Sequence, residues 1–157
     1  MQQKRCLAPF LVLLAMPMWS QTASAATADG IAGTVSTDIS SFIGMKLDGL
    51  IARCGPPDLV YSSRGEQIWQ DDVVFVYNEG DFYIFKDRVW QLGLKSAYGV
   101  TVGDSKPAVF LILGEEVSDH GEFLLLPLPP AGWPLMLRIN FNDAGRVSAI
   151  FIYRPDF

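Results

Sequence analysis

The apolar positions of this chain recur with two periods, and the change between the periods marks out the elements. Those of residues 47–54 fall at helical spacing, and Gly55 with the two prolines after it ends the pattern, because glycine takes the left-handed cap and proline cannot continue a helix. A second helix is predicted from Pro107, a residue tolerated in a first turn, to the terminating Gly114. The pattern thus predicts two short helices of equivalent design.

After each helix the apolar period shortens to two, and β-branched and aromatic residues take over. This alternation predicts antiparallel strands over residues 69–77, 81–85 and 88–95 in the first half and over residues 122–128, 135–142 and 146–154 in the second. Shorter strands are predicted around residues 59–61 and 117–119. Each half is therefore expected to lay a helix on a meander of three or four strands.

The two halves share a spacing as well as a pattern. Gly44 and Gly103 precede the two predicted helices and lie 59 residues apart, as do the terminating glycines. A fixed period is typical of one supersecondary unit present twice. We therefore predict an α+β fold of two tandem repeats, residues 41–97 and 98–157, each a short helix or helix pair packed on a three- to four-stranded antiparallel sheet.

The N-terminus has the features of an export signal. Two basic residues precede an apolar stretch, residues 7–18, and residues 23–25 (Ala-Ser-Ala) form a small-residue cleavage site. We predict a signal peptide over residues 1–25, cut after Ala25. A retained membrane anchor is the alternative, but the stretch is short for a bilayer span and no charged flank follows it.

The segment after the signal peptide and the position of Cys6 complete the prediction of location. Residues 26–40 contain few large apolar side chains and are predicted to form a flexible leader. Cys6 precedes the apolar stretch, whereas the lipidated cysteine of bacterial lipoproteins follows it. We therefore expect an unlipidated protein that is periplasmic or secreted.

Charge and cysteine content restrict the partners. Removal of residues 1–25 takes away two basic residues and no acidic one, which changes the formal net charge from −5 to −7. Such a chain repels nucleic acid and anionic membrane surfaces. Cys54 is then the single cysteine, so no intramolecular disulfide can form. The expected partner is another envelope protein, or a second copy of the chain in a homodimer, with no nucleic acid and no integral membrane segment after cleavage.

The predicted strands are too apolar for a sheet with one solvated face. Residues 73–77, 82–85 and 149–153 are apolar at consecutive positions, whereas a half-buried strand alternates. When the aliphatic residues of the strands at 88–95 and 146–154 are placed under the helices, the residues between them point to the other face. Something must therefore cover part of that second face.

The side chains predicted on the second face are aromatic and polar, as in the centre of a protein interface. Gln91, Phe151 and Tyr153 are placed there by alternation, and the aromatic residues that share one parity in the strand at 69–77 are expected to join them. The candidate partner-binding residues are Trp69, Phe75, Tyr77, Gln91, Phe151 and Tyr153. The alternatives are that the half-sheets pack on each other or on the proline-rich loop, or that the face is a homodimer seam.

The glycine motifs also carry a family resemblance. Residues 44–47 (Gly-Met-Lys-Leu) through 55–57 (Gly-Pro-Pro), and residues 98–103 (Tyr-Gly-Val-Thr-Val-Gly) through 114–115 (Gly-Glu), resemble the opening motif of the BamE (SmpA/OmlA) family. That resemblance implies helices against a small antiparallel sheet. Two such domains in tandem resemble the beta-lactamase inhibitor protein family, which implies a fused sheet whose concave, aromatic-rich surface grips a partner protein.

Candidate catalytic groups are few. His120, the single histidine, lies in a Ser-Asp-His-Gly stretch typical of a solvated turn. Asp71 and Asp72 are adjacent, and neighbours on a strand point to opposite faces, so they cannot act as a dyad. The sequence has no histidine and cysteine cluster with metal-ligand spacing and no phosphate-binding glycine loop. We therefore expect no enzymatic activity, no metal and no cofactor.

The sequence thus predicts an exported, non-enzymatic protein-binding module or inhibitor-like protein of the bacterial cell envelope. One alternative is a structural envelope scaffold that uses its second apolar face to self-associate. Another is a small outer-membrane barrel, because the chain ends in Phe157 after an alternating apolar row. Pro155 inside that row and the two helix-and-stop motifs argue against the barrel.

Overall fold

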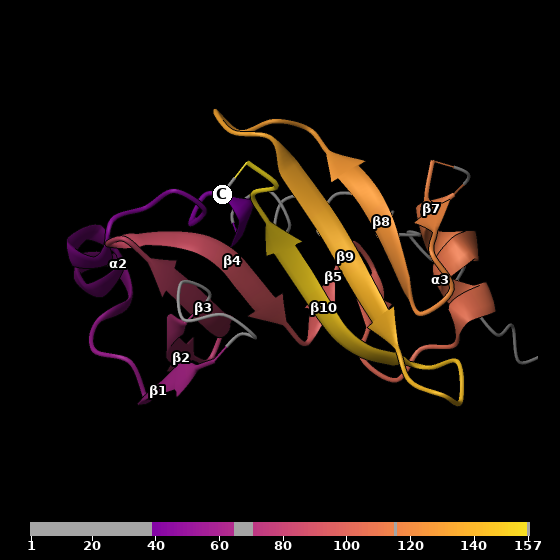
Figure 1. The fold of residues 1–157 in the computed structure, drawn as a ribbon, viewed down its shortest axis with the longest axis horizontal. Coiled ribbons are helices and arrows are strands. Elements are labelled where there is room, and N and C mark those ends of the chain that lie inside the picture. The colour runs from indigo at the N-terminus through magenta and orange to yellow at the C-terminus, as the bar shows by residue number, and fades with distance from the viewer. Residues whose placement is uncertain (1–38, 65–70, 115, 157) are drawn as a thin grey trace, which may run out of the picture.

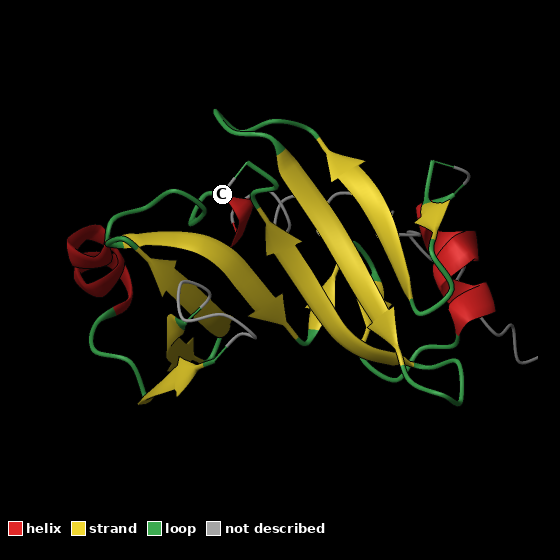
Figure 2. Ribbon diagram, in the orientation of Figure 1, coloured by secondary structure: helices red, strands yellow, loops and turns green. Residues whose placement is uncertain are grey.

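The computed structural model describes residues 39–64, 71–114 and 116–156. The predicted signal peptide, the predicted leader up to residue 38, and Trp69 lie outside these ranges. Figure 1 shows the described chain as a long sheet with helices at its two ends, and Figure 2 shows that strands dominate it.

The elements follow one another in two similar series. The first series is α2 (Leu47–Cys54), β1 (Leu59–Ser63), β2 (Asp72–Tyr77), β3 (Gly80–Phe85) and β4 (Arg88–Leu94). A small hairpin of β5 (Ser96–Ala97) and β6 (Val100–Thr101) comes next. The second series is α3 (Lys106–Leu113), β7 (Ser118–Asp119), β8 (Phe123–Leu128), β9 (Leu135–Phe141) and β10 (Val147–Tyr153).

The long strands form one eight-stranded antiparallel sheet in the order β1-β2-β3-β4-β10-β9-β8-β7. The last strand of each series lies in the middle, where Ile150 pairs with Leu94 and Ile152 with Leu92. The prediction of an α+β fold made of two tandem helix-on-sheet repeats is therefore wrong. The fold is largely β, because the β4–β10 pairing fuses all the long strands into one sheet and the helices are too short to form a layer of their own.

Each helix contributes one fully buried side chain to the core, and Leu47 and Cys54 of α2 and Phe110 and Leu113 of α3 pack partly buried against it. Leu50 is the buried residue of α2 and Val109 that of α3. α2 and α3 lie at opposite ends of the long axis of the molecule (Figure 1), so neither spans the sheet. The sequence pattern located both helices, but their eight residues each are too few to cover a sheet of this width.

Although the long strands form a single sheet, the starts of the two helices are attached to it by equivalent backbone hydrogen bonds. The N–H of Gly44 donates to the carbonyl of Val89 at 2.7 Å, and the N–H of Gly103 donates to that of Val147 at 2.8 Å. Both helices also end at a glycine with positive φ, 79° at Gly55 and 80° at Gly114. The 59-residue spacing in the sequence therefore corresponds to a repeated attachment of a helix to the start of a central strand.

The strand predictions agree with the structure except at the ends of some strands. β2 begins at Asp72, while residues 69 and 70 of the predicted strand lie outside the described residues, and β7 has only two residues. The β5–β6 hairpin was not predicted; it turns through Tyr98 and Gly99, whose φ values are 52° and 81°. Such a two-residue turn with both φ values positive matches the twist of the flanking strands.

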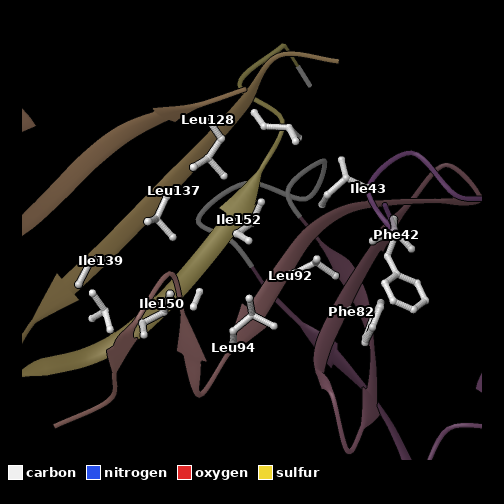
Figure 3. Close-up of a cluster of buried hydrophobic side chains, with 14 of the residues drawn as sticks. Phe42, Ile43, Phe82, Leu92, Leu94, Leu128, Leu137, Ile139, Ile150 and Ile152 are labelled. Atoms are coloured by element: carbon white, nitrogen blue, oxygen red, sulfur yellow. The ribbon is translucent and has the colours of Figure 1, made fainter. Parts of the chain in front are cut away.

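The hydrophobic core lies on one face of the sheet. Leu92, Ile150 and Ile152 point to the same side in the close-up of Figure 3, and none is more than 1% exposed. These aliphatic residues are thus buried on one face as predicted, but the prediction that the helices cover them is wrong, because α2 and α3 lie at the two ends of the sheet. Phe42 and Ile43, which precede α2, pack onto the same cluster, as do Ala97 and Val100 of the small hairpin.

Candidate functional site

The register of the strands divides the side chains of the sheet between its two faces. Residues directly opposite each other in an antiparallel pair share a face. Leu92 lies opposite Phe82 on one side and Ile152 on the other, which defines the core face. Gln91 lies opposite Tyr83 and Tyr153, which are therefore on the other face. We call that second surface the outer face.

Three of the six predicted binding residues meet on the outer face. Gln91 of β4 and Tyr153 of β10 are direct partners across the central seam of the sheet, and Phe151 lies opposite Gly93 on the same face. All three side chains are half-buried. The register thus places the predicted residues of the two central strands on one face, as the alternation predicts.

Phe75 and Tyr77 lie on the core face instead, so the prediction that they point the same way as Phe151 and Tyr153 is wrong. Phe75 lies opposite Phe82, and the ring of Tyr77 meets the ring of Phe82 edge-on at 5.3 Å. The Tyr77 hydroxyl donates a hydrogen bond to the carbonyl of Gly55 at 3.1 Å. These contacts fill the space under α2. Trp69, the sixth candidate, lies outside the described residues.

Tyr83 is the residue that the sequence prediction missed. Its ring and that of Phe151 meet edge-on, with centroids 6.2 Å apart and planes at 76°. Both rings pass over Gly93, where an added Cβ would lie 3.5 Å from each of them. Because glycine inside a strand often marks a close approach by another group, Gly93 was a signal for this aromatic pair.

A groove of about 390 Å³ opens beside the aromatic pair. Tyr83, Gly93 and Phe151 line one part of it, and Asp81 and Lys95 bring one negative and one positive charge to its wall. The outer face is not exposed everywhere, since Val74, which lies between Tyr61 and Tyr83, is fully buried. The groove lies on this face where β3, β4 and β10 meet.

Two ionisable side chains near the aromatic pair, one phenolic and one acidic, have raised pKa values. Burial raises the pKa of Tyr83 to about 12, with further contributions from the nearby Tyr61 and Asp81. Burial also raises the pKa of Asp72, although its carboxylate accepts a hydrogen bond from the Trp90 indole N–H at 3.0 Å. The Tyr83 phenol is neutral at physiological pH, as an ordinary tyrosine is, and the raised pKa extends its neutral form to more alkaline pH.

His120, the one histidine, takes part in a stack of side chains. Its ring lies parallel to that of Phe123 with centroids 4.8 Å apart, and the guanidinium of Arg138 lies 4.1 Å from the centre of the same Phe123 ring. Within residues 39–64, 71–114 and 116–156, no group of three or more histidine, cysteine, aspartate or glutamate side chains is arranged to hold a metal ion. His120 therefore packs against its neighbours in a stack of side chains.

In the described part of the chain, no helix is long and apolar enough to cross a membrane.

Comparison with known proteins yields little. No protein-family model and no curated protein matches the chain. Among solved structures, the fold is similar to that of an extracellular protein containing an SCP domain from Bacillus anthracis, with a TM-score of 0.46 and 13% sequence identity. The match covers 75% of this chain and 46% of that one. A similarity at this level assigns neither a family nor a function.

Proposed function

We propose that this chain is an exported, non-enzymatic protein-binding module or inhibitor-like protein of the bacterial cell envelope. It holds its partner on the outer face, where β3, β4 and β10 meet. The observation that carries the proposal is the Tyr83–Phe151 pair over Gly93, beside a groove of about 390 Å³. Aromatic rings held by neighbouring side chains, next to a few charged groups, are what the energetic centre of an interface requires.

The different side-chain contacts on the two faces of the sheet support partner binding on the outer face. The core cluster occupies the core face, so Phe151 and Tyr153 are not needed to fill it. The groove wall offers aromatic rings together with Asp81 and Lys95, which suits recognition of a polar surface with an apolar centre. A resemblance to the beta-lactamase inhibitor protein family, drawn from the glycine motifs, points to the same use of a fused sheet.

The location is part of the proposal. Residues 1–25 direct export and are cut after Ala25, and the protein then works unlipidated in the periplasm or outside the cell. Its formal net charge of −7 after cleavage favours a protein partner with a basic patch over nucleic acid.

Capture from a native envelope extract tests the proposal. The immobilised protein is compared with a Tyr83→Ala/Phe151→Ala double variant, and with Leu111→Ala as the matched control, because Leu111 is apolar, 87% exposed and on α3 at the other end of the molecule. We expect one stoichiometric partner that the control retains and the double variant loses. Affinity for the purified partner should fall roughly 30-fold or more, as when hot-spot residues are truncated.

Two outcomes would overturn the proposal. The first is a partner that binds the folded double variant as tightly as the unchanged protein. The second is recovery of the chain alone through Tyr83 and Phe151, which would make the outer face the seam of a self-associating scaffold. Hydrolysis of an ester or glycoside that His120→Ala abolishes would contradict the non-enzymatic part.

A further inference from the structure

The two edges of the sheet differ in their protection. β7, at one edge, has two polar residues, Ser118 and Asp119. The Lys106 ammonium holds this edge, donating to Asp119 Oδ1 at 2.7 Å and to the carbonyl of Gly121 at 2.9 Å. Short length and charged side chains are the usual means by which an edge strand avoids pairing with another chain.

β1, at the other edge, has neither form of protection. Its five residues, Leu-Val-Tyr-Ser-Ser, carry no charge and no proline. Leu59, Val60 and Tyr61 are 57%, 48% and 40% exposed. β1 pairs with β2 on one side, and the part of the chain that the structure describes places no strand on its other side. Its outward N–H and carbonyl groups are available for a further strand.

The residues that flank β1 indicate which further strand pairs with it. Asp58 precedes β1 and Arg64 follows it, and both are exposed. In an antiparallel pair of two β1 strands centred on Tyr61, Asp58 of one copy lies opposite Arg64 of the partner subunit, and the reverse holds at the other end. A β1 strand is thus complementary to itself in charge, as a two-fold interface requires. A foreign strand would leave this complementarity without a role.

We propose that two copies of this chain associate through antiparallel pairing of their β1 strands, which makes one sheet continuous through a homodimer. Tyr61 lies at the two-fold axis. Its side chain lies on the outer face, together with those of Val74 and Tyr83. Because the two-fold axis is perpendicular to the sheet, the outer faces of both copies lie on the same side of the dimer. The dimer therefore presents two partner-binding surfaces side by side, which permits bivalent binding. This interface is formed by the backbone of β1, whereas the proposed partner site lies at β3, β4 and β10.

Charge reversal tests the pairing directly. Asp58→Arg and Arg64→Asp each place like charges opposite each other at both ends of the β1 pair, so each variant alone should dimerise at least about tenfold more weakly. Mixed together, the two variants restore an attraction at both ends and should form a heterodimer. The double variant Asp58→Arg/Arg64→Asp should again form a homodimer. Sedimentation equilibrium across the micromolar range measures all four.

Further variants locate the interface and check the fold. Val60→Lys puts a charge on the strand at a half-exposed position and should abolish the dimer while thermal unfolding still shows a folded protein. Phe151→Ala should leave the dimer intact, so failure of this proposal and failure of the proposed function can be told apart.

Three results would overturn the dimer. One is a monomer throughout the micromolar range. Another is a dimer that neither charge reversal weakens, which would place the contact elsewhere, for example on the apolar surface of α3. The third is a monomer that takes up an extended segment of another protein at β1, which would assign the edge to a foreign strand.

Discussion

The two faces of the sheet carry similar aromatic side chains and differ in what those side chains contact. On the core face, Phe82 is fully buried, with the rings of Phe42 and Tyr77 edge-on at 5.1 and 5.3 Å. On the outer face, Phe151 is half-buried and meets the ring of Tyr83 at 6.2 Å. The same residue type is packed on the first face and partly solvated on the second, where we propose that it contacts a partner.

The largest effect should come from truncating a ring on the core face. Phe82→Ala leaves a cavity among fully packed neighbours and should cost about 3–5 kcal/mol of unfolding free energy. Phe151→Ala, the matched change on the outer face, should cost less than about 1.5 kcal/mol because its ring is partly solvated. Urea unfolding followed by tryptophan fluorescence measures both. Equal losses would mean that the outer face is a second core and would break the comparison.

The sequence alone showed which side chains of β4 and β10 point to each face of the sheet. It did not show this for β2. Leu92 and Ile152 alternate with residues that have no aliphatic character, so their parity is readable within each strand. In β2, apolar residues point to both faces of the sheet. Which of them point to the core face depends on the turn that brings Tyr77 opposite Gly80 and on a bulge between Tyr83 and Ile84. No short-range pattern encodes either feature, which is why Phe75 and Tyr77 were placed on the wrong face.

The fold class was missed for a similar reason. The glycine spacing and the helix stops are local signals, and they correctly located α2 and α3. Whether the last strands of the two series pair with each other is a long-range property, decided by burial of Leu94 against Ile150 and Leu92 against Ile152. That pairing converts two expected helix-on-sheet units into one continuous sheet.

A second prediction compares a glycine on each face. At Gly80, on the core face, a Cβ would lie 2.5 Å from the carbonyl oxygen of Gly93, on the neighbouring central strand. Gly80→Ala must therefore push β3 away from β4 and should cost about 2–3 kcal/mol. At Gly93, on the outer face, the nearest atoms would be 3.4–3.5 Å away, so Gly93→Ala should cost less than about 1 kcal/mol.

Thermal unfolding of the two glycine variants checks this difference. Gly93→Ala should also weaken binding of the partner, because the added methyl group lies under the rings of Tyr83 and Phe151. A Gly93 variant that unfolds as readily as the Gly80 variant would show that the aromatic pair is part of the structural core.

A third prediction concerns the hydroxyl groups of tyrosines on the two faces. Tyr77→Phe removes the hydrogen bond to the Gly55 carbonyl that ties β2 to the end of α2, and should cost about 1 kcal/mol. Tyr153→Phe, on the outer face, should change the unfolding free energy by less than about 0.5 kcal/mol. Urea midpoints at neutral pH distinguish the two. A larger loss for Tyr153→Phe would reverse the assignment of structural and contact roles.

The sharpest probe of the outer face is the pH dependence of stability, which leaves the unfolding free energy at neutral pH unchanged. Burial first, then the neighbouring Tyr61 and Asp81, raises the pKa of Tyr83 from 10.0 to about 12. Between these values the native state holds a proton that the unfolded chain has released, so the stability gained from Tyr83 is complete below pH 10 and falls as pH rises toward 12. Tyr83→Phe should unfold with a shallower pH dependence in this window than the unchanged protein. Tyr153→Phe, which removes the other hydroxyl of the outer face and keeps Tyr83, is the control. If Tyr83→Phe leaves the slope between pH 10 and 12 unchanged, the phenol is solvated and the aromatic pair is looser than its edge-on geometry implies.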